Sequence, residues 1–118
     1  MKQILVIDDD AGILDALEAF LESEEYSVIT SSNSDYINKL NPENLPDIIL
    51  LDVLLSGEDG RDVCRKIKSQ TKTMYIPIVM MSAAPDMEAS VKKAKADDFL
   101  KKPFDIEEVL DTIEKYIG

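Results

Sequence analysis

The chain alternates between short runs of consecutive aliphatic residues and longer stretches in which apolar residues recur at helical spacing. A run that is apolar at every position is typical of a parallel strand buried on both faces. Such strands are predicted near residues 3–7, 26–30, 47–51, 77–81 and 98–100. The clearest helical stripes are Ile13, Leu14, Leu17, Phe20 and Leu21, then Val63, Cys64 and Ile67, and finally Ile106, Val109, Leu110, Ile113 and Ile117.

Strands that alternate with helices predict an α/β protein with right-handed crossovers. We expect a (βα)5 architecture, in which a doubly wound, five-stranded parallel sheet has the flavodoxin-like order 2-1-3-4-5. Two of the helices are weaker candidates. The segment 36–40 is stopped by Asn41 and Pro42, and the segment 85–94 is the least apolar.

Composition limits the classes of function. The 118 residues include 13 basic and 24 acidic side chains, a net charge of −11, and no histidine. This charge disfavours direct binding to nucleic acid or to an anionic membrane. The single cysteine, Cys64, cannot form an internal disulfide, and no apolar run is long enough to cross a membrane. We expect one soluble, cytoplasmic domain spanning residues 1–118.

Charged or hydroxyl residues follow the predicted strands, the second being followed only by Ser31 and Ser32, and ligands of doubly wound sheets bind beyond these carboxyl ends. Each residue alone also fits a turn or a helix cap. Together they suggest a cation-binding site, because clustered carboxylates stay ionised at little cost only when a cation lies among them. Without histidine or thiol ligands, such a site suits Mg²⁺, with Mn²⁺ as a substitute. The residues are Asp8, Asp9 and Asp10 after the first strand, Asp52 after the third, Ser82 after the fourth, and Lys101 and Lys102 after the fifth.

Four motifs carry a resemblance to a known family. They are ILVIDDD at 4–10, DIILLD at 47–52, MSA at 81–83 and FLKKPF at 99–104. In this order and at these spacings the chain resembles bacterial response-regulator receiver domains over its whole length. The resemblance implies a phosphorylation-dependent switch of a two-component system. It would accept a phosphoryl group from a sensor histidine kinase or a histidine phosphotransfer protein.

The resemblance also implies a role for each matching residue. It makes Asp52 the phosphoacceptor and places Mg²⁺ on Asp8, Asp9, Asp52 and the backbone carbonyl of Leu54. Ser82 and Lys102 would hold the phosphoryl oxygens, Phe99 would be the aromatic switch residue, and the Lys102–Pro103 peptide bond would be cis. The protein would not be an enzyme, beyond possible removal of its own phosphoryl group. A downstream protein target would bind the face formed by residues 86–118.

The chain departs from the family pattern at three places. Leu55 and Ser56 replace the usual Met-Pro pair after the acceptor, so we expect an altered loop there. Lys95 replaces a usual glycine, and a positive φ at this position would cost of order 1 kcal/mol. Leu54 and Ala84 flank the acceptor where related regulators often carry polar side chains, which predicts a long-lived phosphorylated form.

Two alternatives stay open at this point. Asp8-x-Asp10 after a buried strand also resembles the nucleophile motif of haloacid-dehalogenase phosphatases, which would make Asp8 the covalent residue. The chain is short for that fold. The second alternative is a pseudo-receiver that binds partners without phosphorylation. The complete set of acidic, hydroxyl and lysine residues argues against it.

Overall fold

The computed structural model describes all residues from Met1 to Gly118. Five parallel strands form one sheet in the order β2-β1-β3-β6-β7, which is the predicted order 2-1-3-4-5. Strands β4 (Leu54–Leu55) and β5 (Glu58–Asp59) are not part of this sheet and form a separate two-stranded hairpin. The strands of the main sheet are β1 (Gln3–Ile7), β2 (Ser27–Ser31), β3 (Ile48–Asp52), β6 (Ile78–Ser82) and β7 (Asp98–Lys101).

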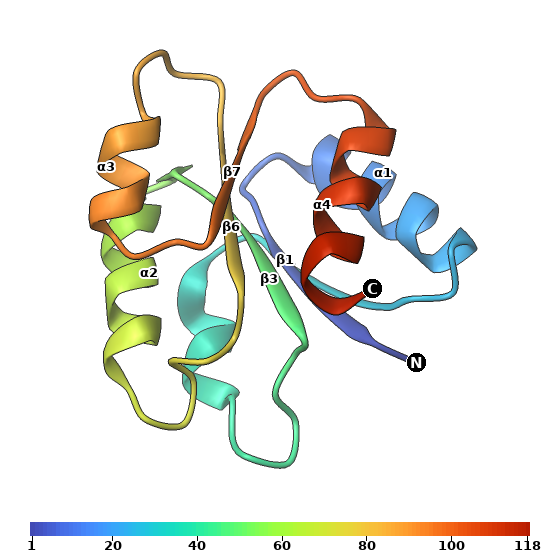
Figure 1. Ribbon diagram of the computed structural model, residues 1–118, viewed down its shortest axis with the longest axis horizontal. Helices are drawn as coiled ribbons and strands as arrows, with labels where there is room; N and C mark the ends of the chain where they lie inside the picture. The colour runs from blue at the N-terminus through green and yellow to red at the C-terminus, as the bar shows by residue number, and fades with distance from the viewer.

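Helices cover both faces of this sheet (Figure 1). One face packs against α1 (Ala11–Ser23) and α4 (Ile106–Ile117). The other packs against α2 (Gly60–Ser69), α3 (Glu88–Lys93) and the 3-10 helix η1 (Ser34–Lys39). Each face therefore has its own apolar core. The central strands β1, β3 and β6 contribute alternate residues to both cores, which explains why they are apolar at successive positions.

The two weaker helix candidates are short in the structure. The predicted helix near 36–40 is a single 3-10 segment, η1, whose first turn is capped by the side chain of Asn33. Helix α3 has only six residues, of which Val91 alone is buried. Lys95, two residues past the end of α3, has a φ of 69°, which is the left-handed conformation considered for this position. The strain predicted for a lysine there is therefore present.

Parallel strands end at one edge of the sheet, and this edge carries the polar residues. Hydrogen bonds continue the sheet beyond the strands, from the Val53 amide to the Met81 carbonyl and from the Lys102 amide to the Ser82 carbonyl. The residues that follow β3, β6 and β7 are thus held next to one another. No helix of the chain is long and apolar enough to span a membrane.

Candidate functional site

Three carboxylates meet at the carboxyl ends of β1 and β3. Asp8, Asp9 and Asp52 each offer an oxygen within 4.8 Å of the others, and we call this group the acidic site. Asp8 is fully buried and Asp52 is only 6% exposed, whereas Asp9 is exposed to solvent. The sequence placed these residues at one edge of the sheet, and the structure brings all three together. Asp10 is not in this group, because its side chain caps the start of α1.

Lys102 connects the two buried carboxylates. Its Nζ donates a 2.7 Å hydrogen bond to Asp8 Oδ2 and lies 3.4 Å from Asp52 Oδ1. Burial by itself lowers the pKa of Lys102, but the hydrogen bond to Asp8 and the charges of Asp8 and Asp52 outweigh it. The pKa therefore lies above its ordinary value. The other oxygen of Asp8 accepts the backbone N–H of Asp10 at 2.9 Å, so this carboxylate is held on both sides.

Asp52 is difficult to ionise in this setting. Burial raises its pKa to about 6, and the charge of Asp8 adds to the effect. Lys102 and the backbone N–H of Leu54 lower the pKa without compensating for these two contributions. One ammonium group does not neutralise three carboxylates, so the acidic site favours an additional cation. Its donors are all hard oxygens, which suit a divalent ion of the Mg²⁺ class.

The two predicted switch residues, Ser82 and Phe99, lie on the neighbouring strands β6 and β7. Ser82 is buried, and its hydroxyl oxygen accepts the Ala84 N–H at 3.0 Å. Phe99 is half-buried on β7 and borders a cavity of about 560 Å³ together with Ala84 and Met87. An aromatic ring next to an open cavity has room to change its rotamer. The Lys102–Pro103 peptide bond is cis, as the resemblance implies.

The loop after Asp52, where an altered conformation was predicted from Leu55 and Ser56, is a β-hairpin. Ser56 and Gly57 connect β4 to β5, and Gly57 has a φ of 78°. The Ser56 hydroxyl donates a 2.8 Å hydrogen bond to Asp9 Oδ2. Sequence reasoning identified Ser56 only as a departure from the family pattern. Its contact with the acidic site had no sequence signal, because 47 positions separate the two residues.

The hairpin is anchored at both ends of its second strand. Glu58 accepts hydrogen bonds from the backbone N–H of Ser34 at 3.0 Å and from its hydroxyl at 2.7 Å. Gly60 then follows so closely that a Cβ at this position would lie 2.1 Å from the carbonyl oxygen of Asp52. A glycine at position 60 is therefore required where the chain passes the end of β3.

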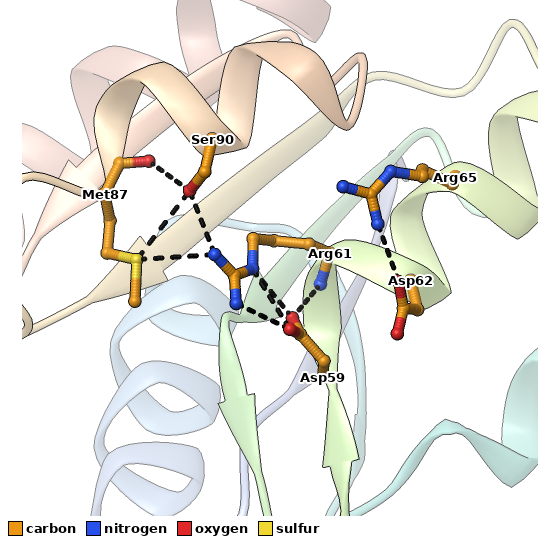
Figure 2. Close-up of polar contacts among 6 residues, drawn as sticks. All are labelled: Asp59, Arg61, Asp62, Arg65, Met87 and Ser90. Atoms are coloured by element: carbon orange, nitrogen blue, oxygen red, sulfur yellow. Dashed lines mark hydrogen bonds and ion pairs between the residues drawn. The ribbon is translucent and has the colours of Figure 1, made fainter.

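Arg61 extends these contacts to α3, as Figure 2 shows. Its guanidinium pairs with Asp59, the closest approach being 2.6 Å, and its NH1 donates to the Ser90 hydroxyl at 3.2 Å. The same nitrogen lies 3.8 Å from the sulfur of Met87. The hydrogen bonds from Arg61 lower the pKa of Asp59 despite its partial burial. The start of α2 is thereby joined to the helix that carries Ser90.

The geometry agrees with comparisons to known proteins. The family model described as response regulator receiver domain matches residues 4–114. The chain belongs to this family. It is 40% identical over 105 residues to the response regulator PleD of Caulobacter vibrioides. The matched region covers 87% of this chain and 23% of PleD. The chain thus spans about a quarter of that curated relative, and less than half of two others, the regulators RpaA of Synechocystis and PhoP of Bacillus subtilis.

Solved structures show the same fold in other receivers. A two-component response regulator from Clostridium difficile superposes with a TM-score of 0.88 at 29% identity, covering 99% of this chain and 96% of that one. The receiver domain of a sensor histidine kinase from Pseudomonas aeruginosa has a TM-score of 0.88 at 26% identity, covering 99% and 98%. That receiver was crystallised with a magnesium ion coordinated in its active-site cleft.

The predicted family, fold and signalling role are confirmed. The chain is a receiver of phosphorylation-dependent two-component signalling, and such domains are switches phosphorylated by histidine kinases or phosphotransfer proteins. Nothing in the comparisons favours the phosphatase or the pseudo-receiver alternative.

Proposed function

We propose that Asp52 is the phosphoacceptor of this receiver and that residues 1–118 act as one switching unit. The observation that supports this most directly is that Asp52 shares Lys102 with a second buried carboxylate: the lysine Nζ lies 2.7 Å from Asp8 and 3.4 Å from Asp52. Receivers take their phosphoryl group from a histidine kinase or a histidine phosphotransfer protein, and we assign this chain a donor of that class.

The acidic site is the proposed position of Mg²⁺, with Mn²⁺ as a substitute. Asp9, Asp52 and the backbone carbonyl of Leu54 would hold the ion, and Asp8 would act mainly through water because Lys102 already engages it. When bound, the ion supplies positive charge that offsets the oxygens of the incoming phosphoryl group. The magnesium in the related Pseudomonas receiver supports this assignment.

In the proposed transfer, a carboxylate oxygen of Asp52 attacks phosphorus in line with the donor imidazole nitrogen. The new O–P bond forms as the N–P bond breaks, and the electron pair of that bond stays with the imidazole. Lys102 and the hydroxyl of Ser82 then hold the phosphoryl oxygens. For Ser82 this requires its hydroxyl to turn from the Ala84 amide toward Asp52.

We propose that this movement shifts a two-state equilibrium. Ser82 approaches the phosphoryl group, and Phe99 turns inward over the space that it leaves. The surface that changes is formed by α3, β7 and α4, within residues 86–118, and a downstream protein target binds there. Signal loss through hydrolysis by the receiver itself would be slow, because Leu54 and Ala84 offer no side chain that orients water.

One experiment tests the assignment. The protein is incubated with Mg²⁺ and acetyl phosphate, and the adduct is located by mass spectrometry. A phosphoryl group on Asp52 is the expected result. Label on Asp8 would instead indicate the phosphatase chemistry, and a protein that takes no label under these conditions would be a pseudo-receiver.

A further inference from the structure

We propose that Ser56 is a positioning residue for the acidic site, where its hydroxyl holds the Asp9 carboxylate in the orientation that binds the divalent cation. The inference rests on the proposed function, because Asp9 is one of the ligands assigned to the metal. It concerns the position at which the chain departs from the usual family sequence.

The three carboxylates of the acidic site differ in how they are held. Asp8 accepts hydrogen bonds from Lys102 and from the Asp10 amide. Asp52 lies near Lys102 and accepts the Leu54 amide. The only hydrogen bond to the exposed carboxylate of Asp9 comes from the Ser56 hydroxyl, at 2.8 Å. Asp9 therefore depends on one donor for a fixed orientation.

The hairpin places Ser56 in a two-residue turn. Leu54 pairs with Asp59 and Leu55 with Glu58, so only Ser56 and Gly57 form the turn. Leu55 is buried in the core below it, and Glu58 is tied to Ser34 by two hydrogen bonds. The backbone on both sides of the turn is thus held in place, by the burial of Leu55 and by the hydrogen bonds of Glu58, and the Ser56 hydroxyl reaches Asp9 from this anchored turn.

A hydrogen bond to a ligand carboxylate has two opposing effects on metal binding. It withdraws negative charge from the oxygens, which weakens the attraction for a cation, and it fixes the carboxylate, which avoids the cost of ordering it. Ser56 bonds Oδ2 and leaves Oδ1 available. Groups that support metal ligands in this way commonly contribute about ten- to hundredfold in affinity. Because Asp9 is exposed, we expect the ordering effect to prevail at about three- to tenfold.

The test is the affinity of the intact chain for Mg²⁺ alone, measured by calorimetric titration at one pH and ionic strength. Ser56→Ala is expected to bind Mg²⁺ about three- to tenfold more weakly than the wild type, and Ser56→Thr, which keeps a hydroxyl, to bind within about twofold. Backbone amide spectra of each variant check that the hairpin is retained.

Ser34→Ala is the matched control. It removes a 2.7 Å hydrogen bond between a serine hydroxyl and a carboxylate on the same hairpin, but that carboxylate, Glu58, is not in the acidic site. Wild-type affinity in this variant supports the proposal. An equal loss in Ser34→Ala and Ser56→Ala would overturn it, since general order of the hairpin would then explain both results.

The inference and the proposed function can fail separately. If the wild type binds Mg²⁺ and takes label on Asp52 while Ser56→Ala binds as tightly or more tightly, the positioning role is wrong and the receiver assignment stands. If the wild type does not bind Mg²⁺ at tens of millimolar, the metal site and the positioning role are both wrong.

Discussion

Lys102 donates a 2.7 Å hydrogen bond to the fully buried carboxylate of Asp8, although one residue follows the last strand of the sheet and the other the first. This bond crosses the acidic site and brings the ammonium within 3.4 Å of Asp52. In the absence of metal, Lys102 is therefore the main positive charge that stabilises the two buried carboxylates.

Replacing Lys102 by Ala should destabilise the metal-free protein by about 1–3 kcal/mol, because a buried carboxylate loses its partner. The measurement is urea unfolding with and without Mg²⁺. We expect added Mg²⁺ to recover part of the loss, since the ion supplies positive charge at the same place. Lys39→Ala, an exposed lysine on η1, is the control and should stay within about 0.5 kcal/mol of wild type. Equal stability of both variants would contradict this account of Lys102.

Asp52→Asn should stabilise the metal-free protein. The folded-state pKa of Asp52 is about 6, above the ordinary value of 3.8, so its ionised form opposes folding. This cost is absent below pH 4, grows as the pH rises through 6 and is complete above it. The variant should therefore match wild type near pH 4 and exceed it by about 1–3 kcal/mol near pH 8, measured by urea unfolding. A lower stability of Asp52→Asn at pH 8 would show that Asp52 has a structural role. Acetyl phosphate should not label this variant.

Much of this arrangement could be predicted from the sequence, and the remainder could not, for physical reasons. The buried strands were recognisable because runs such as Ile48–Leu51 contact apolar neighbours on both faces, and topology then places the residues that follow them. The hairpin after Asp52 has strands of two residues, which are too short to show a periodic pattern. The bond from Ser56 to Asp9 and the pairing of Lys102 with Asp8 depend on three-dimensional packing alone.

Gly60→Ala should be strongly destabilising. The added Cβ would lie 2.1 Å from the Asp52 carbonyl oxygen, and backbone cannot move away as a side chain can. We expect a loss of about 2–4 kcal/mol in thermal or urea unfolding. The control is Gly12→Ala in the first turn of α1, where the nearest atom is an oxygen of the Asp10 side chain at 3.2 Å. Similar unfolding midpoints for the two variants would contradict the close approach at Gly60.

Arg61→Ala should loosen α3 without unfolding the domain. The guanidinium is the side-chain link between the start of α2 and Ser90, so its loss should speed hydrogen exchange of the α3 amides. Arg65→Ala is a matched control because Arg65 pairs only with Asp62 on its own helix (Figure 2). Exchange in α3 that is equally fast in both variants, or unchanged in Arg61→Ala, would mean that this contact does not restrain the helix.

The phosphorylated form should be long-lived because of the side chains around the acceptor. Leu54 is 54% exposed directly after Asp52 and Val53, and Ala84 lies two residues past Ser82. Neither side chain accepts a proton or orients a water molecule for in-line attack on phosphorus. One well-placed polar group contributes about 1–3 kcal/mol to such a transition state, which is roughly ten- to hundredfold in rate.

The double variant Leu54→Asn with Ala84→Glu should therefore lose its phosphoryl group roughly ten- to hundredfold faster than the wild type. The measurement is the decay of protein labelled with acetyl phosphate, after the donor is removed and with Mg²⁺ held constant. Leu54→Ala separates two causes, because it removes a bulky shield without adding a polar group. Faster decay in Leu54→Ala alone would assign the lifetime to shielding by the leucine, whereas decay that is unchanged in the double variant would show that these two positions do not control it.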